Sequence, residues 1–175
     1  RVLVVDARTG RECGVGVAVY PSGDHGVLTD PANPHVAQQR PADYLAAMTA
    51  ATEQALSGAG KRRGFEPAAV VGIGVDTTGS TPLPVTADMT PLADLPQFRD
   101  RLDAQAWMWK DHSGMEEAER ITTLARQHRP QYLAKCGGTY SSEWFFSKIW
   151  HCLKVAPDVF AAAASWVEFA DFIPA

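Results

Sequence analysis

The sequence lacks any run of apolar residues near the roughly 20 needed to cross a bilayer, and its amino end carries no charged-then-apolar leader. Its three cysteines, Cys13, Cys136 and Cys152, form no CxxC pair and no even disulfide framework. Its five histidines are scattered without metal-ligand spacing. We therefore expect a soluble, unexported protein of the reducing cytoplasm, with no membrane partner and no structural metal site.

An excess of positive charge is also missing, since 16 basic residues face 20 acidic ones and the net charge is −4. Binding of a nucleic-acid backbone depends on a concentrated basic surface, so nucleic acid is not an expected partner. The one basic run, residues 61–63, lies in a glycine-flanked connector and is interpreted as solvated. No GxxxxGK[ST] phosphate loop occurs, and Gly72 and Gly74 lie inside a strand-like segment, so they form no dinucleotide fingerprint.

What the sequence does have is enough apolar residues, 46% of 175, to bury a core. Hydrophobic periodicity and turn residues predict both strands and helices along the chain. In the first half we predict a hairpin over residues 2–20, an irregular loop over 21–40, and a helix over 42–57 with Leu45, Met48, Ala55 and Leu56 on its apolar face. A buried central strand over 70–75 and a second strand over 82–85 follow, and the prolines of the second place it at a sheet edge or a bulge. The second half is predicted to hold a helix from the capping-box sequence at 113–116 to about 127, a helix from 141 or 142 to 154, and a further helix from Pro157. This order favours a mixed α/β layer fold.

Polar residues gather where the predicted central strand ends, in the segment DTTGST that spans residues 76–81, called here the hydroxyl loop. Ligands of open α/β sheets bind beyond the carboxyl ends of strands, where loops present polar groups without disturbing the core. Gly79 permits close approach of the backbone to a ligand, and the hydroxyls suit a polyol. The alternative interpretation is a turn whose hydroxyls bond only its own backbone.

Two further segments combine aromatic and charged residues. WMWKDHSG (107–114) sets two tryptophans beside Lys110 and Asp111, an arrangement typical of sugar sites because aromatic rings stack on C–H faces while charged groups take hydroxyls. GGTYSSEWFFSKIWH (137–151) places Glu143 and Lys148 near the start of a predicted helix. A structural Asp-His hydrogen bond in the first segment and an ordinary amphipathic core helix in the second are the alternatives.

The motifs VVGIGVDTTGSTPLPV, WKDH, GGTYSSEWFFSKIWH and SWVEFADFIPA together resemble the amino-terminal domain of the FGGY carbohydrate kinases, and most closely their L-ribulose-phosphorylating branch. The resemblance covers most of the chain. It implies an actin-like, ribonuclease-H-type domain, with a mixed sheet and flanking helices, that is present only in part over residues 1–175. The glycine-rich phosphate loop on the first strand of the family and its carboxyl-terminal domain are expected to be absent.

The resemblance also implies a function. The family transfers the γ-phosphate of Mg-ATP to a sugar hydroxyl, here the 5-hydroxyl of L-ribulose, a step of arabinose catabolism, with an aspartate as general base that we expect beyond residue 175. ATP and Mg²⁺ would then bind mainly to parts outside this chain, and the 175 residues alone are expected to be inactive. The residues for which the resemblance and the motifs imply sugar contact are Gly79, Ser80, Thr81, Lys110, Asp111, Glu143 and Lys148.

Two other functions remain open from the sequence. One is a non-catalytic sugar-binding or sensing domain. The other is a ribonuclease-H-like two-metal nuclease that uses Asp6 and Asp76, each at the end of a predicted strand, and it requires a third carboxylate to converge on them. The sequence leaves the oligomeric state open, with a homodimer as one possibility, and it does not determine which pentulose is accepted.

Overall fold

The computed structural model describes all 175 residues and shows a mixed α/β fold, as predicted, with one three-stranded and two two-stranded antiparallel sheets. Its elements in chain order are β1 (Val2–Val5), β2 (Glu12–Gly16), β3 (Leu28–Asp30), β4 (Asn33–Gln39), α1 (Pro41–Gly60), β5 (Pro82–Val85), β6 (Ala106–Trp107), α2 (Met115–His128), α3 (Pro130–Lys135), α4 (Phe145–Val155), α5 (Pro157–Ala162), β7 (Ser165–Glu168) and α6 (Phe169–Phe172), with short 3-10 turns at Pro67–Ala69, Leu92–Asp94 and Leu102–Ala104.

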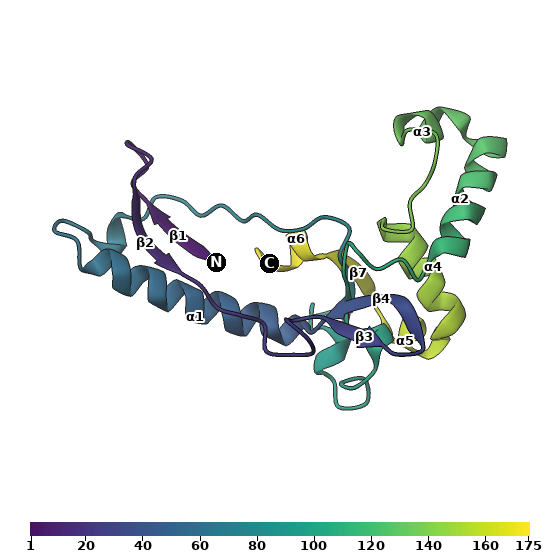
Figure 1. Ribbon diagram of the computed structural model, residues 1–175, viewed down its shortest axis with the longest axis horizontal. Helices are drawn as coiled ribbons and strands as arrows, with labels where there is room; N and C mark the ends of the chain where they lie inside the picture. The colour runs from purple at the N-terminus through teal and green to yellow at the C-terminus, as the bar shows by residue number, and fades with distance from the viewer.

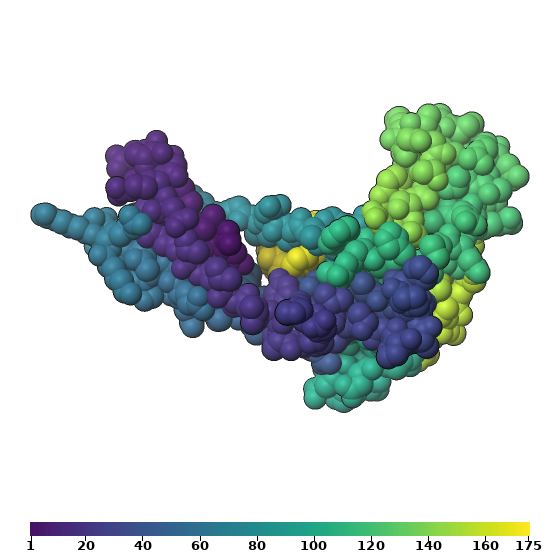
Figure 2. Space-filling model, viewed as in Figure 1, coloured from purple at the N-terminus to yellow at the C-terminus, as the bar shows by residue number.

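The molecule is elongated, with two raised ends and a central body between them (Figures 1 and 2). The β1–β2 hairpin lies on the outer part of α1 at one end, and α2 and α3 form the other end. The three-stranded sheet β3-β4-β6 and the pair β5-β7 lie in the central body. Strands far apart in the sequence therefore meet in the middle, where the two hydrophobic clusters also lie.

The predicted amino-terminal hairpin is confirmed, and it packs on α1 through an unusually close contact. A Cβ at Gly16 would lie 1.8 Å from the carbonyl oxygen of Ala51, and one at Gly14 would lie 2.1 Å from that of Ala55. The face of α1 that meets the hairpin consists of small residues four apart, namely Ala47, Ala51, Ala55 and Ala59, all buried. Helix and strand approach this closely because neither side carries a large side chain at the contact.

The predicted apolar face of that helix is therefore mostly wrong. Leu45, Met48 and Leu56 are between 37% and 41% exposed, and of the four predicted residues Ala55 alone is buried. The prediction assumed that the large apolar residues of the helix are buried, whereas the close contact with the hairpin buries the alanines.

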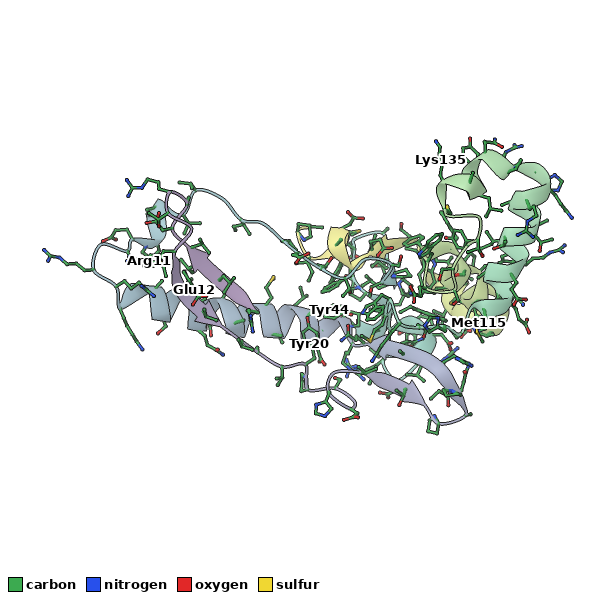
Figure 3. The ribbon with its side chains drawn as sticks, turned by 45° about the horizontal axis from the view of Figure 1, so that its top comes forward. Arg11, Glu12, Tyr20, Tyr44, Met115 and Lys135 are labelled. Carbon is green, nitrogen blue, oxygen red and sulfur yellow. The ribbon has the colours of Figure 1, made fainter.

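Two clusters of buried residues form the core of the central body. Members of the first are Leu92, Ala104, Trp107, Cys152, Ala156 and Val159, and members of the second are Tyr44, Leu83, Val85, Ala106 and Phe172. Tyr44 joins α1 to the second cluster: its ring stacks on Phe169 at 4.1 Å between centroids and meets the edge of Tyr20 at 5.3 Å. Figure 3 shows Tyr20 and Tyr44 side by side at this junction.

Residues 21–40 differ from the predicted irregular loop, because they include β3 and β4. β4 pairs with β6 through Gln38 opposite Trp107 and Gln39 opposite Ala106. Proline at position 34 and two consecutive glutamines hide the usual alternation of a strand, so this strand had no clear signal in the sequence. The position predicted for the prolines of β5 agrees with the structure: β7 is the one strand that pairs with β5, apart from a single bridge between Val85 and Pro91, although all four β5 residues are buried.

The segment 70–75, predicted as a buried central strand, is an unpaired connection that runs along one side of the molecule (Figure 1). Val71 is 87% exposed and Ile73 is 90% exposed. Its composition is that of a strand, but no neighbouring strand of this chain pairs with it.

Of the four predicted helix starts, the ones at Pro157 and near residue 42 agree with the structure, and the other two are shifted. α2 begins at Met115 without a side-chain cap, because the Ser113 hydroxyl donates to Asp111 instead of capping the helix. α4 begins at Phe145, so Glu143 precedes the helix rather than lying in its first turn. No helix of the molecule combines the length and hydrophobicity needed to cross a membrane.

Candidate functional site

One open hollow of about 400 Å³ lies where the hydroxyl loop meets the two tryptophan-containing segments. It is called here the tryptophan hollow, and its lining residues are Thr78, Gly79, Ser80, Trp109, Glu143 and Trp144. Hydroxyls, one carboxylate and two indole rings thus border one space that is open to solvent. Such a combination can hold a small polyol, because the rings stack on C–H faces and the polar groups bond the hydroxyls.

The hydroxyl loop contributes its tip to the hollow. Gly79 has nothing within 4 Å of the position of a Cβ, so its backbone borders open space. Ser80 adopts a left-handed backbone with φ of 56°, a conformation uncommon for a residue other than glycine. Surrounding contacts therefore have to hold Ser80 in place.

Those contacts come from behind the loop. The backbone N–H of Thr81 donates to the Glu168 carboxylate at 2.8 Å, and its carbonyl accepts from the N–H of Phe169 at 3.0 Å. The Lys148 ammonium donates to the carbonyl of Ser80 at 2.6 Å. Burial raises the pKa of Glu168, while the hydrogen bond from Thr81 and the charge of Lys148 act in the opposite direction.

The opposite side of the hollow is formed by Trp109 and by residues before α4. Trp109 is 44% exposed, so much of its ring is free to contact a ligand. The Trp144 ring packs edge-on against Tyr140 at 5.0 Å between centroids, which fixes its orientation. Glu143 lies 3.7 Å from Nε2 of His112, and Nδ1 of His112 lies 2.9 Å from the Ser142 hydroxyl. His112 thus contacts both residues that precede Trp144 in the chain.

Asp111 stabilises the fold and does not border the hollow. It is fully buried, and its carboxylate accepts the N–H of Ala37 at 2.8 Å and the N–H of Ser113 at 3.0 Å. These bonds tie β4 to the turn that follows β6. The adjacent Lys110 is exposed and is not among the residues that line the hollow.

The structure thus brings together some of the residues predicted to contact sugar and separates others. Gly79, Ser80 and Glu143 line the hollow. Thr81, Asp111 and Lys148 lie behind its surface with their side chains fully buried, and Lys110 lies outside it. Sugar contact by any of the seven residues stays a prediction.

Trp144 was missed as a lining residue because it stands in a segment interpreted as an amphipathic helix. Its signal was the Glu-Trp pair directly before Phe145, where the helix begins. Trp107, noted beside Trp109 in the sequence, belongs to the core and donates its indole N–H to the carbonyl of Asp103 at 3.1 Å.

Neither strand-end aspartate forms part of a metal-binding cluster. Asp6 accepts the N–H groups of Arg8 and Thr9 at 2.9 and 3.1 Å, and these bonds lower its pKa and close the turn between β1 and β2. No three His, Cys, Asp or Glu side chains anywhere in the chain converge as a metal site would require. The third carboxylate required by the nuclease alternative is therefore not found beside Asp6 and Asp76.

Comparison with known proteins finds relatives of this chain. No protein-family profile matches it. It is 40% identical to the ribulokinase of Vibrio parahaemolyticus and 39% identical to that of Mycolicibacterium smegmatis, over 100% and 99% of its own length. The ribulokinase of Geobacillus thermodenitrificans is 33% identical over 99% of the chain. The chain spans about 30% of the length of these relatives.

Among solved structures, a xylulose kinase from Brucella ovis has a similar fold, with a TM-score of 0.64 and 20% identity over 85% of this chain and 26% of its own. This likeness concerns the fold. The sequence identities extend along the whole chain and agree with the motifs that carried the resemblance. Over its entire length, the chain is related to the ribulokinases of the FGGY carbohydrate kinase family.

Proposed function

We propose that this chain forms one side of the sugar site of an ATP-dependent kinase that phosphorylates the 5-hydroxyl of L-ribulose. The tryptophan hollow is the observation that carries the proposal, because it brings hydroxyls, a carboxylate and two indole rings together around one open space. The relatives are named ribulokinases, which supports ribulose as the substrate; the L enantiomer is part of the proposal. We propose that the chain is part of an actin-like, ribonuclease-H-type domain of a larger protein, supported by the likeness in fold to a sugar kinase.

The residues of the hollow do not fit Mg-ATP. Its one charged lining residue is the carboxylate of Glu143, which would repel a triphosphate. Phosphoryl transfer depends on cations and backbone N–H groups around the transferred phosphate. We therefore propose that ATP, Mg²⁺ and the general-base aspartate are bound or supplied mainly by the remainder of the protein, and that residues 1–175 alone have no kinase activity.

These residues would contribute by holding the sugar in a fixed place and orientation. The rings of Trp109 and Trp144 would stack on the sugar carbons, and Glu143 would accept hydroxyl protons in hydrogen bonds. Holding a hydroxyl in line with a phosphate accounts for much of the rate enhancement in reactions of this kind. We propose the cytoplasm as the compartment, supported by the three unpaired cysteines.

A coupled kinase assay of the full-length protein tests the proposal. L-ribulose, D-ribulose and D-xylulose are compared at saturating Mg-ATP, and we expect kcat/KM for L-ribulose to exceed that for D-xylulose by about tenfold or more. Calorimetric titration of the same protein with each sugar is run in parallel. Sugar binding without turnover would contradict the kinase and favour a sensing domain, and absence of both would contradict a sugar site.

A further inference from the structure

Lys148 is the most completely enclosed cation of the molecule, with none of its surface exposed. Its ammonium group donates to the carbonyl of Ser80 at 2.6 Å and to the carbonyl of Met108 at 2.6 Å. No carboxylate lies within ion-pair distance of it. Both hydrogen bonds of this buried ammonium go to backbone carbonyls, and these bonds compensate for its burial. Removing the ammonium would leave the two carbonyl oxygens without these partners.

The two carbonyls belong to opposite sides of the tryptophan hollow. Ser80 is itself a lining residue, and Met108 directly precedes the lining residue Trp109. The two are 28 residues apart in the chain and are not paired in any strand. Lys148 therefore connects the hydroxyl loop to the tryptophan segment from behind the surface that a ligand would touch.

The connection also bears on the backbone of the hydroxyl loop. Ser80 has the left-handed φ of 56°, which requires contacts that favour it over the ordinary regions. The ammonium bond to its carbonyl and the Glu168 bond to the next N–H, that of Thr81, act on the two atoms of one peptide group. This peptide group is thus held at both its oxygen and its nitrogen.

We propose that Lys148 is a positioning residue that fixes the distance and orientation between the two sides of the sugar site, rather than a group that touches the sugar. The proposal deepens the proposed function and rests on it for the identity of the ligand. The charged groups that face Lys148 are Asp111, Glu143 and Glu168, and burial outweighs their effect, lowering its pKa to about 8. Each of them holds a bond or position already described, so none replaces the carbonyls as a partner.

The test uses Lys148→Met in the full-length protein, with Lys154→Met as the matched control. Lys154 lies on the same helix, but its side chain is 49% exposed and contacts Glu116 and Glu117. Hydrogen exchange is measured without any sugar, at the amides of Thr81 and Met108. We expect exchange at both to rise about tenfold or more in Lys148→Met and to stay unchanged in the control, because the hydrogen bonds on both sides open more often.

Kinetics supply the second measurement. Lys148→Met should raise the KM for L-ribulose by about tenfold and leave the KM for ATP within about twofold. Lys148→Gln keeps one NH₂ donor, so it should give a smaller change in both measurements, and it serves if the methionine variant does not fold. A raised sugar KM with unchanged exchange would overturn the proposal and show direct contact. Because exchange is measured without ligand, it reports on Lys148 even if L-ribulose proves to be the wrong sugar.

Discussion

Gly79→Val is the substitution that tests the tryptophan hollow most directly. Gly79 lines the hollow, and a Cβ added there meets nothing within 4 Å. Its backbone is not among those in the left-handed region, so a β-branched side chain causes no strain. The valine would therefore extend into the hollow of about 400 Å³ without disturbing the packing of the protein.

The expected effect can be estimated from the contacts that the valine would block. It would displace a sugar from the backbone of the hydroxyl loop and from the Ser80 hydroxyl. A misfit of one or two methyl groups in a binding site costs about 1–3 kcal/mol, or roughly 10- to 200-fold in specificity. We expect the KM for L-ribulose to rise within that range, and the KM for ATP to change less than about twofold, because the nucleotide does not bind in the hollow.

Steady-state kinetics of the full-length protein and a thermal unfolding curve are measured together. Gly60→Val is the matched control, since Gly60 also has open space at its Cβ position but ends α1, away from the hollow. The control should keep the KM for sugar of the parent. An unchanged KM for L-ribulose in Gly79→Val, with an unchanged melting temperature, would refute the hollow as the sugar site.

Three further predictions concern stability and association. Gly16→Ala should lower the free energy of unfolding by about 1–3 kcal/mol or more, because the added Cβ would lie 1.8 Å from a carbonyl oxygen of α1. The control Gly60→Ala should change the free energy of unfolding by less than about 1 kcal/mol, since its Cβ position is open. Equal urea midpoints for the two variants would contradict the close packing of the hairpin on α1. Burial lowers the pKa of Lys148 from 10.5 to about 8 in the folded protein. Between these two pH values the unfolded chain binds more protons than the folded one. The free energy of unfolding should therefore rise with pH in this range, by up to about 1.4 kcal/mol per pH unit. The difference between the parent and Lys148→Met in urea unfolding at pH 7 and 10 measures this rise, and a flat or falling difference contradicts the burial of the ammonium. Ile73→Lys should reduce concentration-dependent association of the 175-residue chain in sedimentation velocity, because Ile73 is 90% exposed in an unpaired segment; an unchanged sedimentation coefficient would show that this segment does not associate.

The sequence predicted the class of the fold and most of the helices, because these depend on local periodicity. It singled out the hydroxyl loop, whose residues Thr78, Gly79 and Ser80 line the hollow, although the strand predicted before this loop is absent and ligand binding stays a prediction. It failed for β4, whose pairing with β6 depends on a partner about 70 residues away, and for the buried face of α1, which is determined by two glycines of the hairpin. Such choices follow from tertiary contacts that periodicity does not record.

For the site residues, too, local sequence patterns indicated some features, while tertiary contacts determined others. Glu143, predicted to contact sugar, lies at the hollow beside Trp144 of the same segment, and sugar contact by it stays a prediction. Lys148, Asp111 and Thr81 were grouped with it because they are polar and nearby in the motifs. Their burial and their hydrogen bonds could not be predicted from spacing, because the partners lie far away in the chain: 68 residues for Lys148 and Ser80, 74 for Asp111 and Ala37, and 87 for Thr81 and Glu168.

The exposed segment 70–75 leads directly into the hydroxyl loop, and the two ends of that loop are held very differently. From Ser80 onward the backbone is held by hydrogen bonds with Lys148 and Glu168, while before Asp76 no strand pairs with it and Val71 and Ile73 are largely exposed. A strand that paired with Val71 and Ile73 would therefore anchor the end of the hydroxyl loop that is free of hydrogen bonds in this chain, leaving Gly79 between two fixed points.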